Sequence, residues 1–273
     1  MNQRRKEDRG YQTFFYHYCS GVRDKEERLR KAAKIAYALE SLSNYPLSSA
    51  TCLDAGCSSG TITNFLASLF AQTIGLDYDA VALANINTTS KNKPVFFIRG
   101  DLMRIPLADG SIDVVICAQV YEHVPSDEVL FAELHRVLKT GGIVFFSGPN
   151  KLFPIEPHYF LPFLHWLPYG WADKYLHVLK RGEHYYERLR TFWELRRLIS
   201  QFGFEVRDVT AELFVGRYLA RWGLWSGLWK FCSKVLIYLT QPLLPNFNWI
   251  LYKSGKMIPR MESYRDIDVE DKD

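Results

Sequence analysis

Small and acidic residues follow the first apolar, strand-like run of the chain. That run ends in Leu53 and Asp54, and the loop Ala55–Gly60 (AGCSSG) comes directly after it. Small residues let a backbone turn tightly and approach a ligand, and the start of the next helix offers N–H groups to a polar or anionic partner. An ordinary strand-to-helix turn has the same composition, so this loop alone does not define a function.

Two further carboxylates close the strand-like runs that come next. Asp77 ends Ile74–Asp77, about one strand–helix unit after the glycine loop, and Asp101 follows Gly100. A carboxylate at a strand tip accepts hydrogen bonds from both hydroxyls of a ribose. Asp101 can accept from an adenine amine, with the N–H of Leu102 serving a ring nitrogen. Any of these acids alone also fits a solvated loop, but loop and acid at this spacing predict a nucleoside cofactor.

The elements that must position these residues alternate between strand and helix from Thr51 to Ser147. Expected strands cover 51–54, 73–77, 95–99, 111–118 and 143–147, and helices cover 24–42, 61–70, 80–88 and 127–138, the last ending over Lys139–Gly142. Such alternation predicts a parallel sheet with helices on both faces and a ligand at the carboxyl ends of the strands. We expect an N-terminal helical segment over 1–50 and the core over 51–150. Substrate-side insertions and the final strands follow over 151–258, and a charged tail over 259–273.

The stretch from Cys52 to Asn150 carries five motifs in order: LDAGCSSG, IGLD, GDL followed by IPL and DGSIDVV, YEHV, and LHRVLKTGGIVFFSGPN. Together they resemble the class I methyltransferases that use S-adenosylmethionine (SAM), in the family often called type 11. The dehydrogenase signature GxGxxG is absent. The resemblance implies SAM as cofactor and an α/β, Rossmann-like, doubly wound sheet of seven strands. In that sheet the last strand, over 247–253, is antiparallel and lies between the fifth and sixth strands, and the C-terminal part forms an aromatic-rich cap.

The resemblance also implies which residues bind the cofactor. Gly56 and Gly60 approach it, Asp77 holds the ribose and Asp101 the adenine amine. Ala118 and Gln119 border the methionine part, and Asp54 orients the loop or reaches the methionine amine. The family's usual middle glycine is Ser58 here. The full predicted set is Asp54, Gly56, Cys57, Ser59, Gly60, Asp77, Tyr78, Asp101, Leu102, Ala118 and Gln119.

Three residues are candidates for catalysis on the acceptor side. His123 follows the fourth strand, and His158 and Tyr159 lie in a proline-bracketed loop after the fifth. A hydroxyl acceptor benefits from a base, whereas a carboxylate needs none. The alternative is that His123 only shapes the pocket and that the loop is aromatic packing. No His, Cys and carboxylate group has metal-ligand spacing along the chain, so we predict no metal.

Composition places limits on location and partners. The 273 residues carry a formal charge of +4, which is too small to indicate a nucleic-acid partner. The five cysteines form no CxxC pair and three lie in or beside apolar runs, which favours reduced thiols in the cytoplasm. The start of the chain is charged and lacks an apolar signal core, so secretion is not expected.

The segment 213–252 defines the acceptor class. It interleaves aromatic residues with Arg217, Arg221, Lys230 and Lys234, and Val235–Tyr252 carries no charge but two prolines. Proline argues against a membrane-spanning helix. The segment fits either a cap over the pocket or a helix at a membrane surface, so the predicted location is cytoplasmic or peripheral at the membrane.

These features favour an O-methyltransferase for a small-molecule or lipid-linked acceptor, such as a saccharide or quinone precursor. C- or N-methylation of a related acceptor has the same sequence signature. Two alternatives stay open: a non-catalytic, SAM-binding partner subunit, and a nicotinamide-dependent oxidoreductase. The sequence does not predict the oligomeric state.

Overall fold

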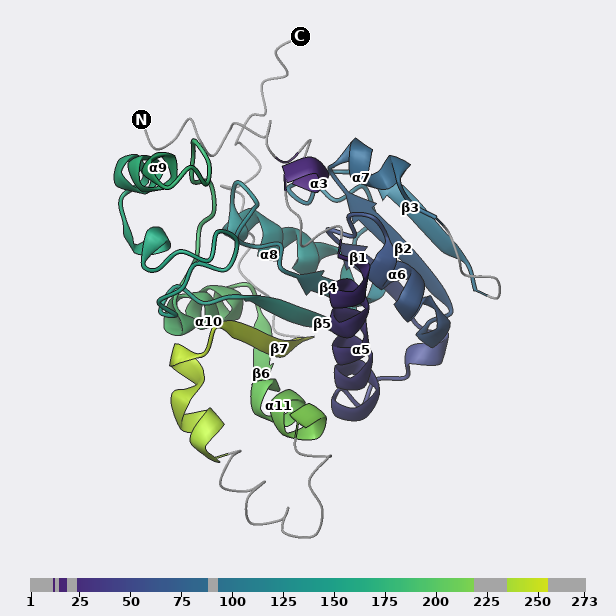
Figure 1. The fold of residues 1–273 in the computed structure, drawn as a ribbon. Coiled ribbons are helices and arrows are strands. Elements are labelled where there is room, and N and C mark those ends of the chain that lie inside the picture. The colour runs from purple at the N-terminus through teal and green to yellow at the C-terminus, as the bar shows by residue number, and fades with distance from the viewer. Residues whose placement is uncertain (1–11, 13–14, 19–23, 88–92, 219–234, 255–273) are drawn as a thin grey trace.

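A single seven-stranded sheet with helices on both faces organises the chain (Figure 1). The structure is a computed structural model, and it describes residues 12, 15–18, 24–87, 93–218 and 235–254. The strands are β1 (Thr51–Ala55), β2 (Gln72–Asp77), β3 (Val95–Arg99), β4 (Ile112–Ala118), β5 (Leu138–Pro149), β6 (Phe204–Asp208) and β7 (Asn246–Lys253). The helices are α3 (Phe15–Tyr18), α5 (Lys25–Leu42), α6 (Thr61–Leu66), α7 (Ala80–Ala84), α8 (Asp127–Val137), α9 (Tyr169–Val178), α10 (Phe192–Gln201) and α11 (Thr210–Tyr218). Short 3₁₀ turns are η1 (Leu47–Ser49), η2 (Ala67–Leu69), η3 (Leu164–Trp166) and η4 (Gln241–Leu243).

The strand order is β3-β2-β1-β4-β5-β7-β6. Neighbouring strands from β3 to β5 pair in parallel, and β7 pairs antiparallel with both β5 and β6. The predicted fold class and the place of the last strand are therefore confirmed. The chain order reverses between β1 and β4, so the connections after these two strands leave in opposite directions and open a crevice at their carboxyl ends.

Alternate residues of the central strands pack into different layers. Val114 and Ile116 of β4 face α5, α6 and α11, whereas Val115 and Cys117 face α8 and α10. Because both faces are covered, the strand is apolar from Val114 to Ala118, and Asp113 near its start is half-buried. Cys52, Cys57 and Cys117 are buried free thiols, and Cys19 and Cys232 lie outside the described residues.

Local capping sets where the helices near the site begin. Asp24 caps α5 by accepting from the N–H of Glu27 at 3.0 Å, and Ser126 caps α8 by accepting from the N–H of Val129 at 3.2 Å. The predicted last residue of the latter helix, Leu138, differs from the observed one by a single position, but Lys139–Gly142 belongs to β5 and does not terminate the helix as predicted. The helix ends at Val137 and β5 starts at once, because a shift in register between the Ile112–Leu138 and Val114–Ile143 pairs absorbs the extra residues as a bulge.

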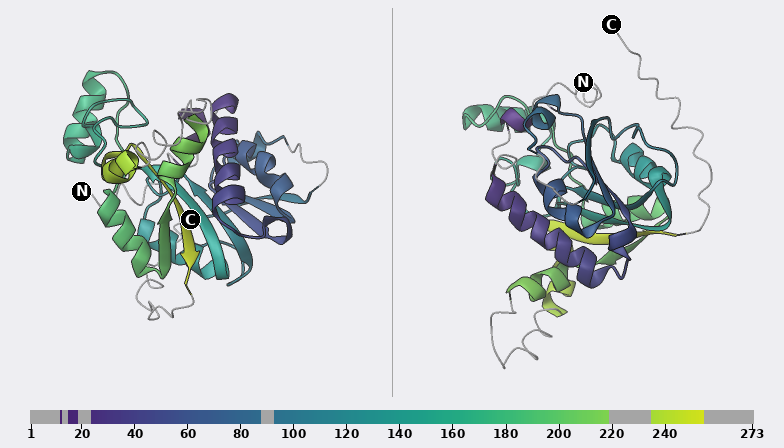
Figure 2. Two further views of the ribbon diagram at one scale, coloured as in Figure 1. Left: turned by 90° about the horizontal axis from the view of Figure 1, so that it is seen from below. Right: turned by 90° about the vertical axis from the view of Figure 1, so that its right-hand side faces the viewer.

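A small lobe, residues 155–186, projects from the sheet beyond the end of β5 and contains η3 and α9 (Figures 1 and 2). It has its own buried cluster of Leu161, Leu164, Ala172, Leu176 and Tyr185. We call it the α9 lobe.

The uncharged stretch 235–252 is divided between elements. It forms a helix over 235–240, then η4, and then β7, whose Trp249 and Ile250 are fully buried in the sheet. Across the described parts of the chain, no helix combines the length and apolar character needed to cross a membrane.

Arg190 ties the segment that leads into α10 to the start of α8. Its guanidinium pairs with Asp127, at 2.7 Å from Oδ1, and with Glu128; the Asp127 carboxyl is buried. Arg190→Met would leave Asp127 buried without its partner, so we expect a loss of about 3–5 kcal/mol in the free energy of unfolding. Arg30→Met is the matched control, since Arg30 makes an exposed pair with Glu26 and its loss should cost less than about 1 kcal/mol. Urea unfolding measures both, and equal losses would contradict this role of Arg190.

Candidate active site

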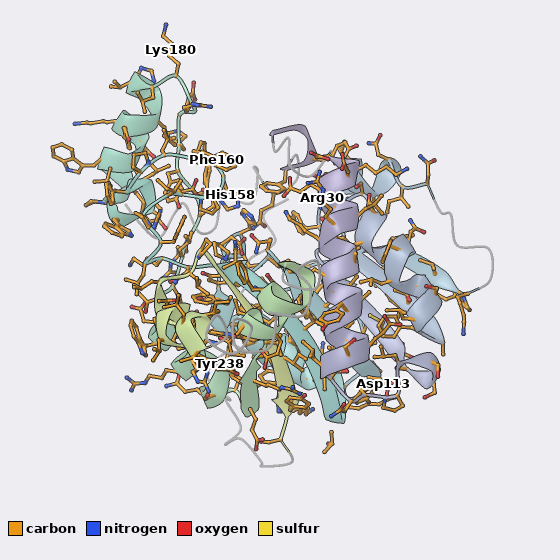
Figure 3. All side chains as sticks on the ribbon, turned by 60° about the horizontal axis from the view of Figure 1, so that its bottom comes forward. Arg30, Asp113, His158, Phe160, Lys180 and Tyr238 are labelled. Carbon is orange, nitrogen blue, oxygen red and sulfur yellow. The ribbon has the colours of Figure 1, made fainter. Side chains whose placement is uncertain are left out.

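A cavity of about 820 Å³ opens at the carboxyl ends of the strands. Its floor is formed by the tips of β1, β2 and β4 with the residues that follow them, one wall by α5, and the outer rim by the loop after β5. Gln12 and Phe15, at the N-terminal end of the described chain, also line it. In Figure 3, His158 and Phe160 lie between α9 and α5, whereas Asp113 is at the opposite end of the sheet.

The loop after β1 turns by means of Gly56. This residue has φ +80°, and a Cβ at this position would lie 2.7 Å from a methyl carbon of Val120. The N–H groups of Gly56 and Cys57 both donate to the carbonyl of Leu76, which brings the loop against the tip of β2. Only glycine fits this combination of conformation and close approach.

Asp77 connects the glycine loop to β2. Its Oδ2 accepts from the N–H of Ser58 at 2.6 Å, and its Oδ1 accepts from the N–H of Asp79 at 2.8 Å. Burial raises the pKa of this carboxyl, while these two backbone hydrogen bonds oppose the rise. Each carboxylate oxygen can accept more than one hydrogen bond, so the group remains able to receive ligand hydroxyls at the cavity wall.

Asp54 and Arg28 form a charged corner beside the same loop. Burial raises the pKa of Asp54 to about 6, against the effect of the Thr63 hydroxyl, which donates to Oδ2 at 2.6 Å. Arg28 of α5 donates from Nη2 to the carbonyl of Cys57 at 3.1 Å, and its buried Nε has no hydrogen-bond partner among the described residues. At neutral pH this corner offers a carboxylate and a guanidinium to a ligand that carries both charges.

Eight of the eleven predicted cofactor residues line the cavity: Asp54, Gly56, Asp77, Tyr78, Asp101, Leu102, Ala118 and Gln119. The prediction that they bind the cofactor stays a prediction. Cys57, Ser59 and Gly60 do not line it. Cys57 is fully buried, and Gly60 packs so closely against Phe97 that a Cβ on it would lie 2.8 Å from the ring. Gly60 therefore serves packing, and Ser58, with φ +51°, takes the place on the cavity wall.

His123 and His158 both line the cavity, with ring centroids 4.8 Å apart. Tyr159 does not line the cavity; its ring packs against Tyr185 inside the α9 lobe. Its backbone N–H, like that of His158, donates to Oε2 of Glu156, and Oε1 of Glu156 lies 2.8 Å from Nδ1 of His158. Of these two successive residues, His158 therefore lines the cavity and Tyr159 packs inside the lobe.

Three carboxyl groups surround the two histidines. Glu122, Glu156 and Glu187 are all buried. Oε1 of Glu122 lies 3.8 Å from Nε2 of His123, and Oε1 of Glu187 lies 4.0 Å from Nδ1 of His123. Neither oxygen of Glu122 has a hydrogen-bond partner among the described residues.

The two histidines of this cluster have pKa values shifted in opposite directions. Burial and the positive charge of His158 lower the pKa of His123 well below its ordinary value, so His123 is neutral at pH 7. Burial alone would lower the pKa of His158, but the hydrogen bond to Glu156 and the charges of Glu187, Glu156 and Glu122 raise it to about 9. Burial raises the pKa of Glu122 to about 7. A neutral imidazole therefore lies beside an imidazolium.

Glu122, His123 and His158 each also offer an atom of the kind that binds metals, and these atoms lie within 4.8 Å of one another. The prediction of no metal considered spacing along the chain and did not anticipate this grouping in space. It stays a prediction.

Sequence reasoning missed the contribution of α5 and of the buried acids. Arg28, Lys31 and Lys34 of α5 line the cavity, and Nζ of Lys34 donates to Oδ1 of Asn248 at 2.8 Å. Their spacing of three residues places them on one face of the helix, which was a usable signal. Nothing in the sequence indicated which partner that face would meet.

Comparison with known proteins agrees with this architecture. Residues 53–146 match the model of a methyltransferase domain. The chain is 36% identical over 100 residues to a probable S-adenosylmethionine-dependent methyltransferase of Mycolicibacterium smegmatis. This match covers 37% of this chain and 38% of that protein. They are 30% identical over 172 positions to the ubiquinone biosynthesis O-methyltransferase of Thiobacillus denitrificans, covering 62% of this chain and 70% of the relative.

Solved structures show the same fold. One belongs to the complex between the Haloferax volcanii Trm112 methyltransferase activator and the putative methyltransferase; it has a TM-score of 0.56 and 16% identity and covers 89% of this chain and 97% of that one. Another is a putative sarcosine dimethylglycine methyltransferase from Galdieria sulphuraria, with a TM-score of 0.55, 17% identity, and coverage of 88% and 92%.

The chain belongs to the class I methyltransferases that use S-adenosylmethionine. The nicotinamide-dependent oxidoreductase alternative is therefore not supported. The matched region spans about 36 to 38% of the mycobacterial relatives' own lengths, against 70% of the Thiobacillus protein.

The charge of His158 depends on Glu156. We expect His158 to titrate near pH 9 in the native protein. Glu156→Gln removes one negative charge and the charged hydrogen bond, so the pKa of His158 should fall and the ring should lose its proton at a lower pH. NMR of the imidazole resonances measures both titrations. A native pKa below 7, or one unchanged by Glu156→Gln, would contradict this account of the cluster.

Proposed function

We propose that the protein transfers a methyl group from SAM to a hydroxyl oxygen of a small-molecule or lipid-linked acceptor. The observation that carries this proposal is the neutral His123 on the wall of the cavity that also contains Gly56, Asp77 and Asp101. A base is what a hydroxyl acceptor requires, because it must lose its proton as the new bond forms.

The cavity fits the cofactor. Asp77 would hold the ribose hydroxyls and Asp101 the adenine amine, while Ala118 and Gln119 would border the methionine part. The buried, unpartnered Nε of Arg28 and the carboxylate of Asp54 match the carboxylate and ammonium of an amino acid. When bound, SAM supplies a methyl group attached to a positively charged sulfur. Once the methyl group is transferred, the rest of the cofactor is a neutral thioether.

His123 and its neighbours would handle the proton. The acceptor hydroxyl gives its proton to the neutral imidazole of His123 while its oxygen forms the new bond to carbon. The imidazolium is then stabilised by Glu122 and Glu187 on either side, and Glu122, with a pKa of about 7, can in turn accept the proton. The positive charge of His158 stabilises negative charge that develops on the acceptor oxygen.

The acceptor end of the cavity combines polar and apolar walls. The polar residues Lys31, Asn150 and Asn246 line the cavity, and so do the apolar residues Phe153 and Ile155. Such a lining suits an acceptor with a polar, hydroxylated end and an apolar body. The ubiquinone biosynthesis relatives, which are named O-methyltransferases, support a quinone-like acceptor, and a lipid-linked saccharide has the same two-part character.

An assay of methyl transfer distinguishes an enzyme from a protein that only binds SAM. With labelled SAM and fractionated cell lipids and glycans, the native protein should label an acceptor. His123→Gln should lower the rate by about 100-fold or more, the usual scale for a general base. Its affinity for SAM should change little. The control is His184→Gln, since His184 is exposed on the α9 lobe and should keep full activity.

Two results would contradict the proposal. Binding of SAM without labelling of any fraction would favour the alternative of a non-catalytic, SAM-binding partner. Full activity of His123→Gln would show that the acceptor needs no base from this residue, as a carboxylate does not.

A further inference from the structure

The α9 lobe exposes large apolar side chains. Phe160 is 76% exposed, Val178 75% and Trp171 67%, and Phe163, Trp166, Leu167 and Leu179 are each more than one-third exposed. The lobe already has a buried core on its inner side, so these residues are not needed to hold it together. A gathering of this kind on one small lobe marks an interaction surface.

The charges around this face have one predominant sign. Lys174, Lys180 and Arg181 are exposed, against the single exposed carboxylate of Glu183. Trp171, Lys174 and Val178 share one face of α9, and Nζ of Lys174 lies 5.6 Å above the ring of Trp171. Tryptophan and basic residues on one helix face are typical of segments that lie in the interface of an anionic bilayer.

The apolar face continues into the cavity. Phe160 is largely exposed and at the same time lines the cavity near His158 (Figure 3), and Ile155 is also one of the lining residues. A molecule that is partly embedded in a lipid layer under the lobe would therefore meet the acceptor end of the cavity at its rim. No comparable apolar rim is needed for an acceptor that arrives from water.

A second exposed apolar group lies on the same side of the molecule. Leu236, Leu239 and Leu243 are 62%, 75% and 61% exposed in and after the helix 235–240. In Figure 1 and in the left view of Figure 2 this yellow helix and the α9 lobe both lie to the left, away from β3, with the lobe at the top of Figure 1 and the helix lower down. Part of the segment 213–252, in which the sequence suggested membrane contact, is thus on this side, while residues 219–234 lie outside the described residues.

We propose that the α9 lobe docks the protein onto an anionic lipid bilayer, with Trp171, Val178 and Phe160 in the interface and Lys174, Lys180 and Arg181 against the headgroups. This inference rests on the proposed function, whose acceptor it specifies as lipid-linked and drawn from the bilayer. A second copy of the chain fits this face less well, because a twofold contact would bring the same cations together.

Vesicle binding of the full chain tests this, measured by flotation without cofactor or acceptor. Native protein should bind vesicles of phosphatidylcholine mixed with phosphatidylglycerol more tightly than vesicles of phosphatidylcholine alone, and added salt should weaken the binding. The double change Trp171→Ser with Val178→Ser, and the double change Lys174→Glu with Lys180→Glu, should each weaken partitioning by about tenfold or more. The control is Phe96→Ser, because Phe96 is 52% exposed on β3 at the opposite edge of the sheet.

Three outcomes would overturn the proposal: no binding of the native protein to anionic vesicles, equal loss with Phe96→Ser, or a dimer in sedimentation that the Trp171 and Val178 changes dissociate. Calorimetric binding of SAM by each variant shows that it is folded. Methyl transfer to a water-soluble acceptor should stay unchanged in the lobe variants, so failure of docking is distinguishable from failure of the proposed reaction.

Discussion

The reversal of strand order between β1 and β4 is the constraint on which the rest of the structure depends. Because the connections leave these neighbouring strands in opposite directions, nothing of the sheet covers their tips, and the N–H and carboxylate groups there face a cavity. The hydrogen bond from the Ser58 N–H to Asp77 then fixes the loop of β1 to the tip of β2. The N–H groups of Gly56 and Cys57, which donate to the carbonyl of Leu76, hold the same loop, and side chains from α5 and the loop after β5 complete the cavity.

Burial of acids beside histidines gives the acceptor end its chemistry. Taking Glu122, Glu156 and Glu187 out of water is costly, and the positive charge of His158 offsets part of that cost. The same positive charge helps to keep His123 neutral. One arrangement therefore explains both an imidazole that is neutral at pH 7 and a cation beside it. Opposite shifts in adjacent groups of this kind are a common mark of acid–base sites.

The sequence predicted the sheet well because its signals are local. The run Ile112–Ala118 is apolar except for Asp113, as a strand buried on both faces over most of its length requires, and Asp77 closes its strand as predicted. Side-chain direction within a motif was less predictable. Cys57 and Ser58 are neighbours, yet one is buried and the other lines the cavity; likewise Tyr159 packs within the α9 lobe whereas His158 lines the cavity. The role of Arg28 depends on how α5 packs across the loop, which spacing along the chain does not encode.

Calorimetry of SAM binding to native protein and to Asp77→Asn tests the central claim most directly. If the strand tips hold the cofactor, native protein binds SAM and Asp77→Asn binds it about 100-fold more weakly, since two hydrogen bonds to a charged group are weakened. The unfolding midpoint should change little, and Asp109→Asn, at an exposed carboxyl, should bind like the native protein. Equal affinity of Asp77→Asn and native protein would contradict the account.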